Sequence, residues 1–205
     1  IFKISSFDNL SFDNSSLYNN NYITYSSDTD LINTRLKNDM GIYLFCYGSN
    51  SLEQVKERTK NYQLKSIKAY LPNHSRIFCG KSNKWNGAVA SIIENNNDKV
   101  KGSLVFLKEK NLDKLDKFEG ANKNINPFSK KDNLYRRKYL TVKDENHNDI
   151  KCITYIKNNH EWILPPSEEY LTSIRNHLKQ HWEEYKNDLN ELYIFDKNFK
   201  MKATF

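Results

Sequence analysis

The pattern of apolar and polar positions changes near residue 41. Residues 1–40 are rich in Asn, Ser and Asp, and their scattered aromatic residues follow no helical or strand period. Such a composition is typical of an arm, and the spaced aromatic residues predict that it docks on a neighbouring surface. From Gly41 the apolar run over residues 42–47 predicts a buried strand, which ends at the turn Gly48-Ser49-Asn50. We therefore divide the chain into an arm, 1–40, and a domain, 41–205.

The next segments predict one helix and a series of strands. Asn50, with Glu53 three residues later, predicts an N-cap for a helix from Leu52 to about Lys60. Four stretches rich in Ile, Val, Phe and Tyr then predict strands and a β-rich core: Lys65–Leu71, Ser75–Cys79, Ala88–Ile93 and Lys101–Phe106.

Two more helices and a hairpin are predicted in the second half. Asn111 is expected to cap a short helix in which Leu112, Leu115 and Phe118 share one face, and Gly120 is expected to end it. The apolar runs 139–142 and 150–156 flank a polar loop and predict a hairpin. The segment 165–167 opens a helix with one apolar stripe, made of Tyr170, Leu171, Ile174, Leu178, Trp182 and Tyr185.

Length, charge and cysteine content exclude several classes of protein. A chain of 205 residues can bury a core without disulfides, and its longest apolar run is far below the roughly 20 residues of a membrane-spanning helix. The net charge is +7, but its densest cluster (Lys130, Lys131 and residues 136–138) reads as a solvated face, so nucleic-acid binding is not expected. Three widely spaced cysteines without C-x-x-C indicate neither a disulfide framework nor a cysteine zinc site, which favours a cytoplasmic location.

Two segments are candidates for chemistry. At Tyr47-Gly48-Ser49-Asn50 a glycine turn precedes a helix, where unpaired N–H groups can bind an anion such as a carboxylate; the alternative is a turn that uses Gly and Asn only for its backbone conformation. Glu119 ends an amphipathic helix directly after a Phe expected in the core. The negative helix end and apolar neighbours would suit a carboxylate that exchanges protons, and the alternative is an exposed Glu beside a helix end.

The histidine pair does not predict a metal site. His177 and His181 stand four residues apart, which places both rings on one helix face. The Glu that follows the first His in the metalloprotease motif is absent, so we expect surface histidines and no bound metal. The glycine-rich nucleotide loops and the serine-hydrolase elbow are also absent.

Six short motifs in order resemble the γ-glutamylcyclotransferase family over roughly residues 41–185. They are Phe45-Cys46-Tyr47-Gly48-Ser49-Asn50, residues 85–92 (WNGAVASI), residues 100–102 (VKG), residues 115–120 (LDKFEG), residues 152–155 (CITY) and residues 165–170 (PPSEEY). Because each motif is short, their common order is what makes the resemblance specific.

The resemblance implies a fold and a reaction. The implied fold class is α+β, a small mixed β-barrel flanked by helices. The implied reaction converts a γ-glutamyl amino acid or peptide to 5-oxoproline and the free amino acid, because the substrate's own α-amine attacks its γ-carbonyl. No cofactor is implied, and the implied partner is this small molecule.

The resemblance also assigns site residues. Glu119 matches the acid/base position. The segment Leu44, Phe45, Cys46, Tyr47, Gly48, Ser49 and Asn50 is implied to face the substrate, with backbone N–H groups on its α-carboxylate. Tyr155 matches a substrate-contacting tyrosine, and Tyr135 and Tyr170 are candidates for the pocket wall, with ordinary core packing as the alternative.

One departure concerns the substrate. Family members often have Gly-Gly where this chain has Gly87-Ala88, two residues also placed at the substrate, and the added methyl group at Ala88 is expected to narrow the pocket. The alternatives are a cyclotransferase directed at glutathione or at γ-glutamylamines, and a non-catalytic member of the fold that binds a metabolite. The oligomeric state stays open, with a homodimer as one candidate.

Overall fold

The computed structural model describes residues 40–121, 135–158, 160 and 164–185, together with the backbone of 191–196 and 199–204. Except for Met40, the predicted arm of residues 1–40 lies outside the described residues. The basic residues Lys130 and Lys131 also lie outside them.

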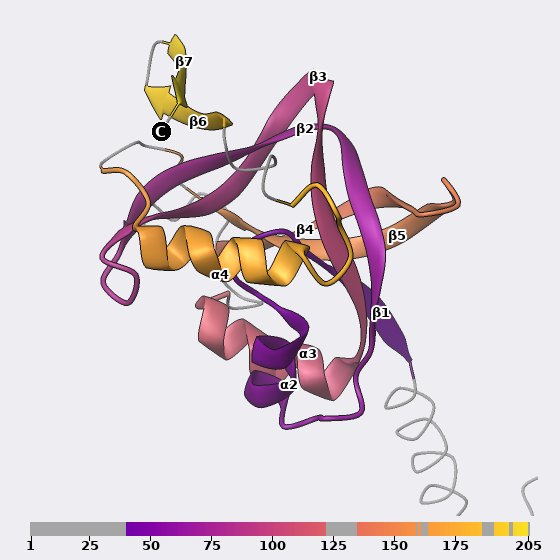
Figure 1. The fold of residues 1–205 in the computed structure, drawn as a ribbon. Helices are drawn as coiled ribbons and strands as arrows, with labels where there is room; N and C mark the ends of the chain where they lie inside the picture. Colours follow the sequence, from indigo (N-terminus) through magenta and orange to yellow (C-terminus); the bar gives the residue numbers. More distant parts are fainter. Residues whose placement is uncertain are drawn as a thin grey trace, which may run out of the picture.

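Five strands close into a barrel. They are β1 (Gly41–Cys46), β2 (Ser66–Ser82), β3 (Gly87–Lys108), β4 (Tyr135–Asp144) and β5 (Asp149–Lys157). Their order is β3-β1-β5-β4-β2, and β2 pairs again with β3, so the sheet closes on itself (Figure 1). The β1–β5 pair is parallel and the other barrel pairs are antiparallel. The predicted α+β fold with a small mixed barrel is confirmed.

The four stretches predicted as strands between residues 65 and 106 all lie in strands, but they join in pairs into the two long strands β2 and β3. Pro72 and Asn73 do not end β2: Pro72 pairs with Lys99 and His74 with Glu94, so residues 95–98 of β3 bulge opposite Asn73. The Ser75 hydroxyl donates to Asp98 (2.6 Å) and accepts from the Asn95 amide (2.6 Å). Side-chain hydrogen bonds therefore support a bulge, at which a strand bends without ending.

Three helices flank the barrel: α2 (Leu52–Thr59), α3 (Glu109–Glu119) and α4 (Glu168–Leu178). α2 and α3 lie side by side at one end of the barrel and α4 crosses it, packed against β3 (Figure 1). Two predicted caps are wrong. Ser51, and not Asn50, caps α2 by accepting from the Gln54 N–H, and Asn111 lies buried inside α3, which begins two residues earlier.

The close approach of β1 and β3 depends on one glycine. A Cβ atom at Gly102 would lie 2.3 Å from the Cys46 carbonyl oxygen and 2.8 Å from the Phe45 ring. No side chain fits there, so the glycine lets the two strands pack at this distance. Phe45 is itself in the main core cluster, together with Phe78, Leu104 and residues of α4.

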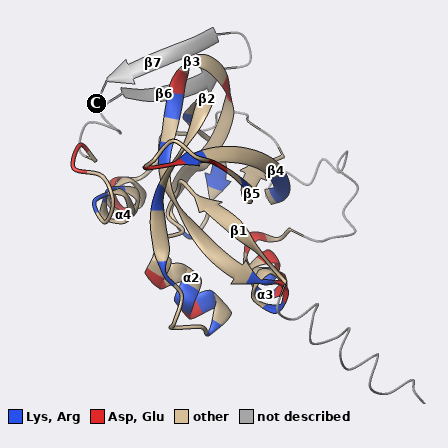
Figure 2. Ribbon diagram, turned by 90° about the vertical axis from the view of Figure 1, so that its right-hand side faces the viewer, with Lys and Arg blue, Asp and Glu red and all other residues tan. Residues whose placement is uncertain are grey.

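The chain continues beyond the domain's last helix as a hairpin that the sequence did not predict. It consists of β6 (Glu191–Asp196) and β7 (Phe199–Thr204), and β6 pairs in parallel with β2 at Ile77 and Phe78. In the part of the chain that the structure describes, no helix is long and apolar enough to cross a membrane. Acidic and basic residues are interspersed along α2, α3 and α4 (Figure 2).

Candidate active site

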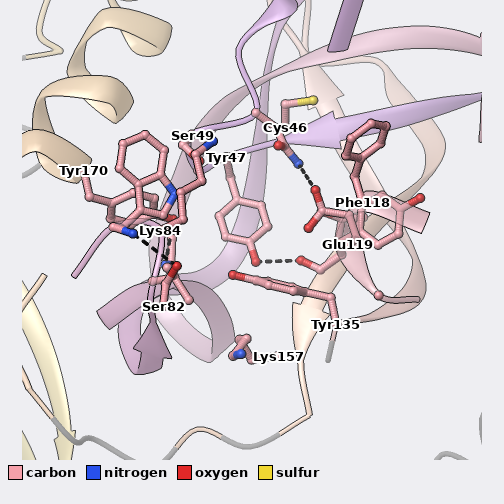
Figure 3. A pocket seen from close by; sticks show the side chains of 18 of the residues that line it. Cys46, Tyr47, Ser49, Ser82, Lys84, Phe118, Glu119, Tyr135, Lys157 and Tyr170 are labelled. Atoms are coloured by element: carbon pink, nitrogen blue, oxygen red, sulfur yellow. Dashed lines mark hydrogen bonds between the residues drawn. The ribbon is translucent and has the colours of Figure 1, made fainter. Parts of the chain in front are cut away.

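A cavity of about 430 Å³ opens where the end of β1, the end of α3 and the start of α4 meet. Ten of the thirteen predicted site residues line it: Phe45, Cys46, Tyr47, Gly48, Ser49, Asn50, Glu119, Tyr135, Tyr155 and Tyr170. Figure 3 shows Glu119 facing the cavity together with Tyr47 and Tyr135. Segments more than 100 residues apart in the sequence thus meet around one space.

Three predicted site residues lie elsewhere, which corrects their expected contact with the substrate. Leu44 lies in the second core cluster, which also contains Val55 and Leu115, and is not among the described residues that line the cavity. A Cβ atom at Gly87 would lie 2.6 Å from the Ser167 backbone nitrogen, and the Ala88 N–H donates to the Pro165 carbonyl (3.1 Å). Gly87 and Ala88 therefore hold the start of α4, and the Ala88 methyl group does not narrow the cavity.

Glu119 is the last residue of α3 and forms an ion pair. Arg58 of α2 and the Asn50 side chain both donate to its Oε1 atom, at 2.5 Å and 3.1 Å. Arg58 also donates to the Asn50 side-chain oxygen (2.8 Å), so the three side chains form a closed triangle. Gly120, with φ of 63°, ends the helix in the left-handed conformation that glycine adopts without strain.

The apolar surroundings predicted for Glu119 are wrong. Phe118 is 61% exposed, and its ring lies 5.5 Å from the Arg58 guanidinium instead of in the core. The carboxylate lies beside a cation and an amide. Arg58 had not been identified from the sequence, because no local pattern links a helix residue to a carboxylate 61 positions away.

A second ion pair anchors the end of α3 to the barrel wall. Arg137 of β4 forms two hydrogen bonds to Asp116, one turn before Glu119, and the Tyr155 hydroxyl donates to the same carboxylate at 2.7 Å. The neighbouring carboxylate raises the pKa of Arg137 although burial opposes it, and burial raises the pKa of Tyr155 above its usual range. These contacts connect β4 and β5 to the helix that carries Glu119.

The turn after β1 offers backbone donors to the cavity. Gly48, Ser49 and Asn50 all line it, and within the described residues their N–H groups donate to no protein acceptor. Successive free N–H groups form a concave site for an anion. The geometry supports the anion site that the sequence predicted at this turn.

The phenol and thiol groups of the cavity are neutral. The Tyr47 hydroxyl donates to the Tyr155 carbonyl (2.7 Å), and the Tyr170 hydroxyl accepts from the Ala90 N–H (2.9 Å). Burial raises the pKa of Tyr170 to about 12 and also raises the pKa values of Tyr47, Tyr135 and the Cys46 thiol. These groups can therefore donate hydrogen bonds or pack, whereas Glu119 is the carboxylate that faces the cavity.

Cations outnumber anions around the cavity. Among its described lining residues, the positively charged ones are Arg58, Lys81, Lys84, Lys117 and Lys157, and the acidic one is Glu119. Lys157 is only 2% exposed, and its ammonium group lies 5.0 Å from the centre of the Tyr135 ring. Figure 3 shows Lys157 and Glu119 on different sides of that ring. The electrostatics favour a ligand with more than one negative group.

The prediction that His177 lies on the surface is wrong. It is 1% exposed, and its Nδ1 and Nε2 atoms lie 2.8 Å from the Gly48 carbonyl oxygen and the Ser103 hydroxyl. Burial lowers the pKa of His177 to about 4, and Arg76 and His181 act in the same direction, while Glu53 and the Gly48 carbonyl oppose them. His181 bonds the Ser66 hydroxyl (2.8 Å). In the described residues, no three His, Cys, Asp or Glu side chains converge as a metal site would require.

Because the pKa of His177 is lowered in the folded protein, we expect the free energy of unfolding to decrease as the pH falls from about 6.5 to about 4. In this interval the unfolded chain binds a proton that the folded chain does not, so the free energy of unfolding decreases. The full effect is about 3 kcal/mol, at 1.36 kcal/mol per pKa unit. Urea unfolding across this range should give a flatter profile for His177→Asn than for the original protein. An unchanged profile, matching that of the exposed-site control His147→Asn, would contradict the prediction.

Comparisons with known proteins agree with this geometry. The sequence model of the family described as "Gamma-glutamyl cyclotransferase, AIG2-like" matches residues 44–179. The chain is 30% identical to the γ-glutamylcyclotransferase of Bos taurus over 155 residues, which cover 72% of this chain and 77% of the bovine protein. It is 26% identical to the mouse γ-glutamylcyclotransferase over 162 residues, covering 68% and 74% of the two chains.

Solved structures share the fold. A γ-glutamyl cyclotransferase superimposes with a TM-score of 0.62 at 23% identity, covering 80% of this chain and 94% of that one. A yeast γ-glutamyl cyclotransferase described as specific to glutathione superimposes with a TM-score of 0.51 at 13% identity, covering 74% and 95%. At these identities the likeness is one of fold.

Proposed function

Because the chain belongs to the γ-glutamyl cyclotransferase, AIG2-like family, we propose that it converts γ-glutamyl amino acids or dipeptides to 5-oxoproline and the free amino acid. The observation that carries this proposal is the placement of Glu119 in a cavity that Gly48 and Ser49 also line, with N–H groups that donate to no protein acceptor among the described residues. A carboxylate beside an anion site suits a substrate with an ammonium group and a carboxylate on the same carbon.

The reaction needs proton transfer and correct placement of the substrate. A bond forms between the α-nitrogen and the γ-carbonyl carbon, and the bond from that carbon to the leaving nitrogen breaks. Starting from an ammonium group, the attacking nitrogen must lose two protons, and the leaving nitrogen must gain two to depart as an ammonium group. Glu119 can accept each proton in turn and deliver it to the leaving nitrogen, so one carboxylate suffices and no cofactor takes part.

Arg58 and Asn50 orient this carboxylate. Both donate to Oε1, and among the described residues no hydrogen bond reaches Oε2. The second oxygen is therefore the one available for proton exchange. A fixed base next to a bound amine and carbonyl supplies the proximity that favours ring closure.

The cations of the cavity support a leaving group that carries its own carboxylate. The α-carboxylate of the glutamyl part would occupy the turn, and the positive charges of Lys84 and Lys157, which line the same cavity, favour a second negative group on the ligand. An amino acid or dipeptide supplies one, whereas a simple amine does not. This favours γ-glutamyl amino acids over γ-glutamylamines; glutathione also ends in a carboxylate and remains the alternative substrate. The retained Glu119 disfavours a non-catalytic metabolite-binding role.

The test compares two matched substrates. Purified protein is incubated with γ-glutamyl-alanine and with γ-glutamyl-ethylamine, which lacks only the carboxylate of the leaving group, and 5-oxoproline is followed by mass spectrometry. Glutathione is assayed in parallel. We expect product from γ-glutamyl-alanine with a kcat/KM at least about tenfold above that of the ethylamide. A folded protein that forms no 5-oxoproline from any of the three would refute the proposal.

Replacing Lys157 by Met is expected to lower kcat/KM for γ-glutamyl-alanine by about tenfold, because a charge-assisted hydrogen bond to the leaving carboxylate is lost. The value for γ-glutamyl-ethylamine should change by less than about threefold. Lys151→Met, at an exposed position of the same strand, is the matched control. Equal losses with both substrates would show that Lys157 supports the cavity without contacting the leaving group.

A further inference from the structure

The carbonyl groups of Tyr47, Gly48 and Ser49, in the turn after β1, all accept hydrogen bonds. The Arg76 Nε–H donates to the Tyr47 carbonyl (3.0 Å), His177 Nδ1 lies 2.8 Å from the Gly48 carbonyl oxygen, and the Ser51 N–H donates to the Ser49 carbonyl (2.8 Å). Three consecutive peptide groups are thus held by three different partners.

Arg76 and His177 are buried behind the turn. Their exposed fractions are 8% and 1%, and neither belongs to the described residues that line the cavity. Arg76 comes from β2 and also donates to the Lys101 carbonyl of β3 (2.7 Å), whereas His177 comes from the last turn of α4. The turn is therefore connected to the barrel wall and to α4, whose first turn places Tyr170 at the cavity.

The hydrogen-bond partners of His177 define its tautomer. A carbonyl oxygen can only accept, so Nδ1 carries the hydrogen that is donated to Gly48. The neutral ring then accepts at Nε2, and the Ser103 hydroxyl donates to it. Both ring nitrogens have a hydrogen-bond partner. These two contacts fix the orientation of the ring, in which the Nδ1–H group donates to the Gly48 carbonyl oxygen.

The orientation of a carbonyl decides the orientation of the next N–H. A trans peptide group is planar, and its C=O and N–H bonds point in opposite directions. Because Arg76 holds the Tyr47 carbonyl behind the turn, the Gly48 N–H points away from Arg76. His177 has the same effect on the Ser49 N–H through the Gly48 carbonyl.

We infer that His177 and Arg76 are positioning residues, which direct the Gly48 and Ser49 N–H groups toward the α-carboxylate of the substrate. The inference rests on the proposed function for the identity of that anion. Neither side chain touches the substrate: each acts through one peptide group. The buried side chains of His177 and Arg76 thus contribute to binding of the α-carboxylate as well as to packing.

Two variants of His177 separate positioning from packing. In His177→Asn the side-chain amide nitrogen takes the place of Nδ1 and can still donate to Gly48. In His177→Gln it takes the place of Nε2, so the contact with Ser103 is kept and the contact with Gly48 is lost. Both replacements remove the ring and insert an amide, so a purely structural role predicts similar behaviour. His181→Asn, four residues further along the chain and bonded to Ser66, is the control.

The experiment measures the binding of 5-oxoproline and of 5-oxoprolinamide, in which a neutral amide replaces the carboxylate. Binding is monitored through the backbone amide NMR signals of Gly48 and Ser49. The original protein, His181→Asn and His177→Asn should bind the acid at least about tenfold more tightly than the amide, with downfield shifts of both signals. In His177→Gln the preference for the acid over the amide should fall below about threefold, and the downfield shifts of the Gly48 and Ser49 signals should be smaller.

Each outcome decides the inference. Equal ratios in the Asn and Gln variants, or no difference between acid and amide in the original protein, would overturn it. Formation of 5-oxoproline from γ-glutamyl-alanine, γ-glutamyl-ethylamine and glutathione is measured separately on the original protein. Absence of product from all three would refute the proposed function even where the turn binds the acid as expected, so the two failures are distinguishable.

Discussion

Replacing Glu119 by Gln is expected to lower kcat for γ-glutamyl-alanine by about 100- to 10,000-fold, the range typical for loss of a general acid–base group. Gln has the same shape, and its carbonyl oxygen can still accept from Arg58 and Asn50, so the cavity should keep its geometry. What is lost is the exchange of a proton. KM should stay within about threefold of the original value, because the anion site at Gly48 and Ser49 is unchanged.

The matched control is Glu109→Gln, which removes a carboxylate at the exposed opposite end of the same helix. It should keep nearly full activity. Retention of more than a tenth of the activity by Glu119→Gln, with an unchanged unfolding curve, would show that another group transfers the proton.

The second large effect is expected for Asp116→Ala. This change leaves Arg137 and the Tyr155 hydroxyl without their shared acceptor inside the barrel wall. Breaking a buried ion pair by removing one partner destabilises a protein by about 3–5 kcal/mol, and part of Arg137 reaches water, so we expect about 3 kcal/mol. Because α3 also carries Glu119, kcat should fall as well.

Urea unfolding of Asp116→Ala, Arg137→Met and the double variant tests this explanation. The double variant should be more stable than Asp116→Ala alone, since it no longer contains a partly buried Arg137 cation that has lost its main partner and keeps only the more distant Asp113 (3.7 Å). Asp149→Ala, which breaks the exposed Lys143–Asp149 pair, is the control and should have a far smaller effect. Additive losses in the double variant would show that Asp116 and Arg137 act independently.

Elements with strong local signals were predicted correctly. The run before Gly48 forms β1, Gly120 ends α3, and Ser167 begins α4. The hairpin of β4 and β5 also has its predicted loop. Each of these depends on residues within a few positions of one another, so their physical causes can be read directly along the chain.

Errors arose where neighbours in space override neighbours in sequence. Asn50 is a good N-cap by composition, but its side chain is engaged with Glu119 and Arg58, and Ser51 caps the helix instead. Phe118 follows the apolar period of α3 yet remains exposed beside Arg58. Strand β2 continues beyond Pro72, because β3 bulges opposite this position, although proline usually marks the end of a strand.

The sequence by itself determined the family, the barrel's main elements, the glycine turn and the carboxylate of Glu119, because these depend on short motifs in a specific order. Only the tertiary structure decided what surrounds them. Arg58 reaches Glu119 across 61 residues and His177 reaches Gly48 across 129. Such contacts follow from closure of the barrel and packing of its helices, and a hydrogen bond between distant residues leaves no periodicity along the chain from which it could be inferred.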